Sequence, residues 1–311
     1  MHLTVIICTY NRCEGLRTCL TDLREQCADL DIDWEVLVVD NNSSDSTSDV
    51  LQTLSRDFPR PLRWIREAKQ GLSHARNRGI LEASGRYVVF TEDDVRIDRL
   101  WVASICETFA KSSCDAVAGR IELFWTAPRP PWLTDELLGF LGYLDYGEAR
   151  ALTEDTPFFG GNMAFARSVF EKIGMFDPNL GRQGRKLIGG EEIDLYKRFL
   201  AAGMRAFYQP KAVVHHVIYS RRLRRGYFRS LHYQEGRLRG EECVMTGGKS
   251  IAGVPLFMFP QIGRSIAKFV RAAWRDGAHR SLRSEMNVWY FVGFIMGCVE
   301  RRFGREDILP I

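Results

Sequence analysis

Residues 87–95 read YVVFTEDDV, a short apolar run that ends in three consecutive acids. Its aromatic and β-branched residues predict a buried strand, and Gly85 marks a break just before it. The acids then lie at the carboxyl end of the strand, where ligands collect in open α/β sheets. Because bare charges are costly to bury, Glu92, Asp93 and Asp94 predict a divalent cation, with magnesium or manganese favoured beside phosphates. A solvated acidic turn is the alternative interpretation.

The chain before this stretch alternates between strand and helix patterns. Near-continuous apolar runs predict buried parallel strands at Leu3–Tyr10, Trp34–Val39 and Leu62–Ile65. Apolar residues recur at helical spacing between the strands, and Ser73 is placed to cap the helix that precedes Gly85. Such alternation is typical of βαβ units. We predict an α/β fold with a Rossmann-like, mostly parallel sheet flanked by helices.

Three polar residues in this half bear on ligand binding. Asp40 follows the second predicted strand, where nucleotide-binding folds place a carboxylate against a ribose hydroxyl. No GxGxxG motif follows the first strand, which disfavours a dinucleotide dehydrogenase. Arg76 and Arg78 lie near a predicted helix N-terminus and could face phosphate oxygens, unless both are ordinary surface arginines.

A glycine-containing segment follows in the second half of the chain. In FFGGNMAFA, residues 158–166, Gly160, Gly161 and Asn162 stand between apolar residues. Glycines in such a context predict a backbone that passes close to a ligand, with a plain tight turn as the alternative.

A second acidic cluster opens a predicted helix at GGEEIDL, residues 189–195. Glu191, Glu192 and Asp194 crowd its N-terminus, where the helix dipole alone would stabilise them, or where one carboxylate serves as a general base. His215 and His216 lie on a predicted strand soon after. Neighbours on a strand face opposite sides, so at most one of them joins the acids as a metal ligand.

Composition limits the functional classes. A chain of 311 residues, 45% of them hydrophobic, can bury a substantial core. The eight cysteines form no CxxC pair, and residues 1–10 do not resemble a signal peptide, so we expect free thiols and a cytoplasmic location. The net charge of +4 is concentrated beyond residue 216.

Seven segments, in order, resemble the glycosyltransferase family 2 pattern on a GT-A fold. They are VIICTYNR, VLVVDNNSSDST, QGLSHARNRGI, VVFTEDDV, FFGGNMAFARSVFEKIGMFDPNLG, GGEEIDLYKRFLAAG and AVVHHV. The resemblance covers residues 3–223 and implies a catalytic domain at 1–223. It implies inverting, metal-dependent transfer by a hexosyltransferase-type enzyme, from a nucleotide diphosphate sugar to a hydroxyl of a glycan acceptor.

The resemblance also implies roles for individual residues. By position, the family's nucleoside-binding residues correspond to Thr9, Tyr10, Arg12 and Asp40. Glu92, Asp93 and Asp94 match the DxD element, in which Asp94 is the expected contact to Mn²⁺ or Mg²⁺. Register with the family's histidine favours His216 over His215 as the ligand near the diphosphate, which Arg76 would also face.

Glu192 matches the position of the catalytic base in the resembled family. The family more often has Asp there and at the first acid of the DxD element, where this chain has Glu92. Glu191 and Asp194 therefore stay in consideration as base or as acceptor-orienting groups. Gly160, Gly161 and Asn162 are expected in the loop around the acceptor or the donor sugar.

Residues 224–311 predict a basic, helical C-terminal region. Apolar residues share one helical face, namely Ile262, Ile266, Phe269, Val270 and Ala273, and basic residues lie on another, namely Arg264, Lys268, Arg271 and Arg275. This pattern is typical of an interfacial helix. The apolar run at 288–299 is too short to span a bilayer. We expect peripheral attachment to the anionic inner face of the cell membrane; a helical subdomain or dimer interface is the alternative.

The function expected from the sequence is sugar transfer to a glycan or polyprenyl-linked acceptor in surface polysaccharide synthesis, with a UDP-sugar the favoured donor. A non-catalytic nucleotide-sugar-binding protein stays open as an alternative. So does a sugar-phosphate nucleotidyltransferase, although TYNRCEGLR lacks the Gly-rich basic loop that such an enzyme would need after its first strand. No nucleic-acid-binding module accompanies the basic region, so no nucleic-acid partner is expected.

Overall fold

The computed structural model describes residues 2–26, 32–182, 189–243, 249–277 and 280–304. These residues divide into two compact units. The first holds the described residues up to Phe124 and most of those between 142 and 217, and the second holds Trp125–Leu141 and the described chain from Ile218 onward. The domain boundary predicted at 223/224 therefore lies a few residues beyond the end of the first unit, and the segment Trp125–Leu141, from within the predicted catalytic domain, belongs to the second unit.

A mixed sheet forms the centre of the first unit. Its strands are β1 (His2–Thr9), β2 (Asp33–Asp40), β3 (Leu62–Arg66), β4 (Tyr87–Glu92), β5 (Val95–Ile97), β6 (Ala116–Trp125), β7 (Arg150–Ala151), β8 (Asn162–Ala166) and β9 (Ala206–Ile218). The helices that flank it are α1 (Cys13–Arg24), α2 (Thr47–Leu54), α3 (Leu72–Glu82), α4 (Trp101–Lys111), α5 (Ser168–Ile173) and α6 (Glu191–Ala201). The predicted α/β class is confirmed.

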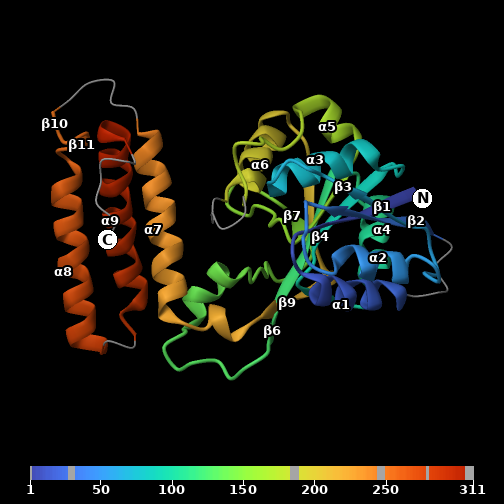
Figure 1. Cartoon of the computed structure of the whole chain (residues 1–311), viewed down its shortest axis with the longest axis horizontal. Coiled ribbons are helices and arrows are strands. Elements are labelled where there is room, and N and C mark those ends of the chain that lie inside the picture. Colours follow the sequence, from blue (N-terminus) through green and yellow to red (C-terminus); the bar gives the residue numbers. More distant parts are fainter. Residues whose placement is uncertain (1, 27–31, 183–188, 244–248, 278–279, 305–311) are drawn as a thin grey trace. The chain divides into compact units, whose positions relative to one another are not determined.

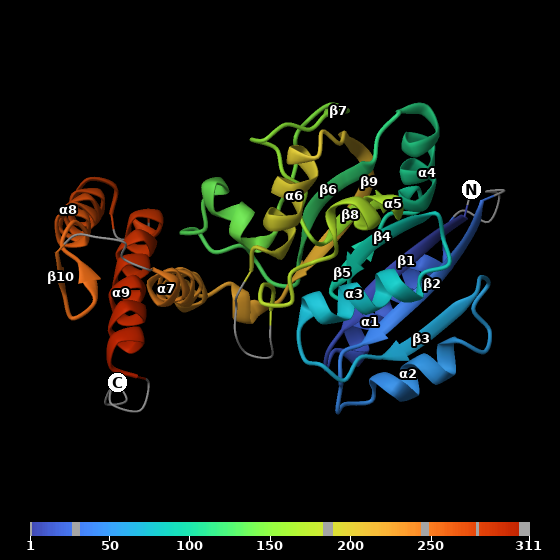
Figure 2. The same ribbon diagram turned by 90° about the horizontal axis from the view of Figure 1, so that it is seen from above.

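The strand order is β3-β2-β1-β4-β8-β6-β9-β5, with β7 paired to β9 (Figures 1 and 2). Strands β3, β2, β1 and β4 are parallel, as the apolar runs predict, whereas β8 joins β4 in the antiparallel direction. The register pairs Thr9 with Asp40 and Cys8 with Glu92. The residues that follow β1, β2 and β4 therefore meet at one edge of the sheet.

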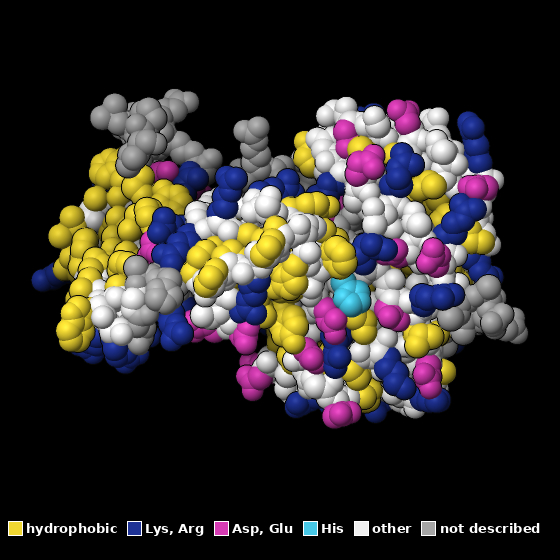
Figure 3. Space-filling view, turned by 90° about the horizontal axis from the view of Figure 1, so that it is seen from below, with side chains coloured by type: hydrophobic (Ala, Val, Ile, Leu, Met, Phe, Trp, Pro, Cys, Tyr) yellow, Lys and Arg dark blue, Asp and Glu magenta, His cyan; other side chains and the backbone are white. Residues whose placement is uncertain are grey.

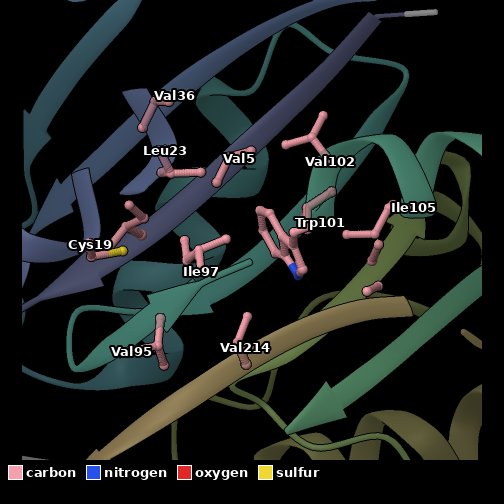
Figure 4. Packing of buried hydrophobic residues seen from close by; sticks show 14 of the residues in the cluster. Val5, Cys19, Leu23, Val36, Val95, Ile97, Trp101, Val102, Ile105 and Val214 are labelled. Carbon is pink, nitrogen blue, oxygen red and sulfur yellow. The ribbon is translucent and has the colours of Figure 1, made fainter. Parts of the chain in front are cut away.

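Helices cover both faces of the sheet, because successive strand residues point to opposite sides. Val5 and Ile7 pack with α1, α2 and α4, while Ile6 packs with α3, α5 and α6. Figure 1 shows α3, α5 and α6 above the sheet and α1 and α2 below it. In Figure 4 the indole of Trp101 lies among Val5, Val102, Ile105 and other apolar side chains of the core between the sheet and helices α1, α2 and α4.

Two local predictions are wrong. Ser73 does not cap α3, because the N-cap residue of this helix is Gly71. The Ser73 hydroxyl instead donates to the Leu180 carbonyl (2.6 Å). The strand predicted at His215 and His216 is the end of a longer strand, β9, which begins at Ala206 and continues through Pro210. A proline is tolerated there because its missing N–H matters only where a neighbouring strand needs a donor.

Three long helices dominate the second unit, together with short 3₁₀ turns at Asp135–Leu141 and Ser220–Arg222 and a hairpin formed by β10 (Ser250–Ile251) and β11 (Val254–Pro255). The helices are α7 (Arg225–Glu242), α8 (Met258–Asp276) and α9 (Leu282–Phe303), and α9 lies between the other two (Figures 1 and 2). Among the described helices, none has both the length and the apolar character needed to cross a bilayer.

Glycines bring α7 and α9 into close contact. A Cβ at Gly236 or Gly240 of α7 would overlap a backbone carbonyl of α9, and one at Gly293 or Gly297 of α9 would overlap a carbonyl of α7. Arg237 also reaches Glu300 across the interface (2.7 Å). The pair α7/α9 is therefore packed backbone to backbone.

Candidate active site

The acids of the β4–β5 turn are held by residues that follow β1. Thr9 Oγ1 donates to Asp93 Oδ2 (2.7 Å), and the Arg12 guanidinium donates to Asp93 Oδ1 (3.1 Å) and also contacts Asp94 Oδ2. Both aspartates are buried. The alternative of a solvated acidic turn is therefore wrong: Asp93 and Asp94 form an enclosed anionic group at the sheet edge.

Strand register brings His216 to these acids. Val95 of β5 pairs with His216 of β9, which places the imidazole Nε2 3.3 Å from Asp94 Oδ2. One ligand atom each from Glu92, Asp94 and His216 lies within 4.8 Å of the others. His215 faces the opposite side of the strand, where its Nδ1 lies 3.4 Å from Glu122 Oε2. Of the two histidines, the structure brings His216 to the acids.

Electrostatics at this group favour an added cation. Burial raises the pKa of Asp93 to about 7; Arg12 opposes this effect and Asp94 adds to it. Two carboxylates and an imidazole offer hard oxygen ligands with one nitrogen, a donor set that fits Mn²⁺ well and Mg²⁺ through its oxygens. Added positive charge would relieve the repulsion between the aspartates.

The residues expected at the nucleoside lie on two interlocked loops. Asp40 is buried at the end of β2 and accepts from the Ser43 amide (2.9 Å), while the Tyr10 ring is partly exposed. Asn11, at φ 51°, accepts from the Ser44 amide (2.8 Å) and so ties the loop after β1 to the loop after β2. Asparagine tolerates this left-handed conformation better than most residues.

The second acidic cluster is organised by a buried arginine. Arg76 Nη1 of α3 contacts Glu191 Oε1 of α6 (2.8 Å), and its Nη2 donates to the Gly160 carbonyl (3.2 Å). Both side chains of the ion pair are buried. Arg76 thus connects α3, α6 and the glycine segment. The surface interpretation is therefore wrong for this residue, and its contact with a phosphate stays a prediction.

Glu192 stands next to this pair with an unusual protonation equilibrium. Burial, together with the neighbouring Glu191, raises the pKa of Glu192 to about 7, and Arg76 limits this rise. Among the described residues, no hydrogen-bond donor reaches the buried Glu192 Oε2. A carboxylate with this pKa is suited to accept a proton near neutral pH.

The glycine segment links the two acidic clusters. Gly160 holds Arg76 through its carbonyl, and a Cβ on Gly161 would lie 3.7 Å from the Glu92 carboxyl carbon. A Cβ on Gly160 would collide with the Arg76 guanidinium. The glycine segment therefore lies between a group that could bind a cation and a carboxylate that could accept a proton.

The comparisons with known proteins decide the family. The sequence profile described as glycosyl transferase family 2 matches residues 4–174, more than half of the chain. The chain belongs to glycosyl transferase family 2.

Relatives and solved structures agree with this family 2 assignment. The glucosyl-dolichyl phosphate glucuronosyltransferase of Haloferax volcanii is 27% identical over 228 residues, 71% of each chain. The succinoglycan biosynthesis protein ExoM of Rhizobium meliloti is 23% identical over 89% of this chain and 91% of its own. A mannosyltransferase from Pyrobaculum calidifontis, solved with GDP-Man and Mn²⁺, has a TM-score of 0.61 at 20% identity and covers 97% of this chain and 87% of its own. The predicted GT-A fold is confirmed.

Three predicted residues of this family 2 glycosyltransferase are committed to structural contacts. Asn162 is buried and accepts from Trp101 Nε1 (2.9 Å) while donating to two backbone carbonyls. Asp194 pairs with Arg198 on the same helix (2.8 Å). Arg78 forms an exposed pair with Glu82 (2.8 Å), as the surface interpretation expects. These contacts give each of the three residues a structural role, and a ligand contact by Asn162 or Asp194 stays a prediction.

Two residues that position the site are missing from the sequence-based set. Asn11 ties together the two loops expected at the nucleoside. The sequence could have indicated this role, because an asparagine just after a strand is typical of a left-handed turn. Gly142, at φ 89°, passes so close to His216 that a Cβ would lie 3.0 Å from Nδ1. No local signal identifies Gly142, because the contact joins segments far apart in the sequence.

Proposed function

We propose that this family 2 glycosyltransferase is an inverting enzyme that uses a divalent cation and a nucleotide diphosphate sugar to glycosylate a hydroxyl of a lipid-linked glycan. The observation that carries the proposal is the pairing of two unlike groups across one glycine segment. Glu92, Asp94 and His216 suit a cation, and Glu192 suits proton transfer near neutral pH. A sugar transfer from a diphosphate is helped by both, because charge develops on the leaving oxygen and the acceptor hydroxyl loses a proton.

The cation would be held by Asp94 and His216, with Glu92 beside them. When bound, Mn²⁺ or Mg²⁺ supplies positive charge that stabilises the leaving diphosphate. Asp93 is then kept ionised by Arg12 and Thr9 on its other side.

The nucleoside would lie on the loops after β1 and β2. Thr9, Tyr10, Arg12 and Asp40 surround this edge, and the exposed Tyr10 ring offers a stacking surface for the base. We expect a UDP-sugar. A GDP-sugar is the natural competitor in a screen, because the fold neighbour was solved with GDP-Man.

Glu192 would act as the general base in a single displacement. The acceptor oxygen forms its bond to the anomeric carbon as the bond to the diphosphate oxygen breaks, and the diphosphate leaves with the electron pair. The acceptor proton passes to Glu192. Attack from the face opposite the leaving group inverts the anomeric configuration. Arg76 and Glu191 hold the first turn of α6, and Arg76 limits the rise in the pKa of Glu192.

The names of the relatives and the character of the C-terminal region support the proposed acceptor class. One relative is named for a glucosyl-dolichyl phosphate acceptor and another for succinoglycan biosynthesis. We extend these names to a lipid-linked glycan in surface polysaccharide synthesis, reached at the cytoplasmic face of the membrane. The described cysteines are all free thiols, which suits that compartment.

A donor screen tests this function. UDP-, GDP- and dTDP-sugars are incubated with Mn²⁺ or Mg²⁺, and the release of nucleoside diphosphate is measured with and without a crude lipid-linked acceptor fraction. We expect one donor class to turn over, and Glu192→Gln to reduce the rate by about 10²–10⁴-fold. Glu154→Gln, in an exposed loop, is the matched control. Near-wild-type turnover by Glu192→Gln would exclude this residue as the base, and no turnover of any donor would favour a non-catalytic binding protein.

A further inference from the structure

Helix α8 carries a row of exposed apolar side chains. Phe259 is 40% exposed, Ile266 44%, Val270 58% and Trp274 88%. Spaced at three or four residues or multiples of them, these four lie along one side of the helix, and we call them the α8 stripe. Figure 3 shows hydrophobic side chains gathered at the left of the view, in the part of the molecule that α8 and α9 form.

The opposite side of α8 is the one that holds the fold together. Met258 and Ser265 are buried, and Met258 packs with Val254, Phe294 and Cys298 in a small core. The close packing of α7 on α9 does not involve the stripe. The second unit therefore completes its own core and leaves the stripe in solvent.

Basic residues form a second row on α8. Arg264, Lys268, Arg271 and Arg275 are all exposed, and their spacing of three or four residues places them along one line of the helix. The only acid within the helix is its last residue, Asp276. A helix that exposes an apolar row and, separately, a positive row matches a layer that is apolar inside and anionic outside.

We propose that the α8 stripe inserts into the interfacial layer of an anionic lipid bilayer while the basic row contacts the headgroups. A nearly fully exposed tryptophan suits the boundary between acyl chains and headgroups. A second copy of the chain is disfavoured as the occupant, because pairing two such faces would bring basic rows of like charge together. Lipid binding by the α8 stripe does not depend on the proposed function. Only its purpose does, which is to bring the active site to a lipid-linked acceptor.

Vesicle cosedimentation tests this surface. We expect the full chain to bind vesicles of phosphatidylcholine with phosphatidylglycerol at low salt, and binding to weaken at high salt and on pure phosphatidylcholine. Ile266→Ser/Val270→Ser/Trp274→Ser should reduce the partition coefficient at least about 30-fold, since three partly exposed apolar side chains lose their burial. Leu81→Ser/Leu100→Ser removes exposed apolar side chains from the first unit and should leave binding unchanged.

A variant and a matched control test the basic row separately. Arg264→Glu/Arg271→Glu should weaken binding by at least about tenfold, because each reversed charge near the surface loses its attraction to anionic lipid. Arg56→Glu/Arg99→Glu makes the same change in net charge at exposed positions of the first unit. Equal losses in both double variants would overturn the proposal in favour of a non-specific effect of net charge.

Tryptophan fluorescence provides a second test if the triple variant folds poorly. Brominated lipids should quench the fluorescence of the wild-type chain more than that of Trp274→Phe, which keeps an aromatic ring at that position. Equal quenching, or undiminished vesicle binding by a folded triple variant, overturns the proposal. So does a dimer in solution that the triple variant dissociates, which would identify a second copy as the occupant. Asp94→Ala should bind vesicles normally, so failure of the catalytic proposal is distinguishable from failure of this one.

Discussion

Replacing Glu192 by Gln should stabilise the protein at alkaline pH while removing most of its activity. Burial and Glu191 raise the pKa of Glu192 to about 7, from the 4.5 of an ordinary glutamate. The folded state therefore favours the protonated carboxyl. The stability that the protonated form contributes is complete at low pH and is lost as the pH rises through about 7.

The size of the effect follows from this shift. Each unit of pKa difference corresponds to about 1.4 kcal/mol, so ionised Glu192 destabilises the fold by up to about 3 kcal/mol at pH values near 9. The same relation leaves less than about 1 kcal/mol near pH 5. Gln has no charge to bury and nearly the same shape as Glu. The free energy of unfolding of the Glu192→Gln variant should therefore exceed that of the wild type by about the cost of the ionised carboxylate at each pH.

Urea denaturation at both pH values measures the gain. We expect the midpoint for Glu192→Gln to exceed that of the wild type near pH 9 and to approach it near pH 5, with an unchanged slope. Glu154→Gln, at an exposed position, should match the wild type throughout. A gain of equal size at both pH values, or no gain near pH 9, would refute the interpretation that a buried, destabilised carboxylate is kept at this position.

Three further predictions concern side chains around this carboxylate and in the cores. Arg76→Met should lower the free energy of unfolding by about 3–5 kcal/mol, because it leaves the Glu191 carboxylate buried without its guanidinium partner. It should also move the acid limb of the pH–rate profile to higher pH. Arg78→Met, at an exposed position, should do neither. Asn162→Ala leaves an indole N–H and two carbonyls without their partner, so thermal denaturation should show a loss of about 2–4 kcal/mol while calorimetry shows little change in nucleotide affinity. Gly240→Ala should destabilise the second unit by about 1–3 kcal/mol because its Cβ meets α9, whereas Gly226→Ala, in open space on the same helix, should be neutral or stabilising.

The sequence predicts the parallel half of the sheet well, for a physical reason. Strands buried on both faces need apolar residues at every position, and β1, β2 and β4 show this as continuous runs. The acids after β4 stand out because no buried strand could contain them. Fold class and the anionic edge of the sheet therefore follow from local patterns alone.

Contacts between distant segments could not be predicted in the same way. The position of His216 beside Asp94 depends on how β5 pairs with β9, and the pairing of Arg76 with Glu191 joins helices 115 residues apart. Asn162 resembles a loop ligand in sequence, yet its amide bridges α4, β6 and β9 inside the fold. The contact between α7 and α9 is equally hidden, because glycines that allow close approach look like weak points of a helix.

The most direct test of the active-site assignment is the affinity for UDP and GDP by titration calorimetry, with and without Mn²⁺, in the wild type, Asp94→Asn and the exposed control Asp155→Asn. We predict that Mn²⁺ tightens binding of one nucleotide at least about tenfold in the wild type and the control, and has little effect in Asp94→Asn. The same affinity with and without Mn²⁺ in the wild type, or a full metal effect in Asp94→Asn, would contradict the assignment of these acids to a metal–diphosphate site.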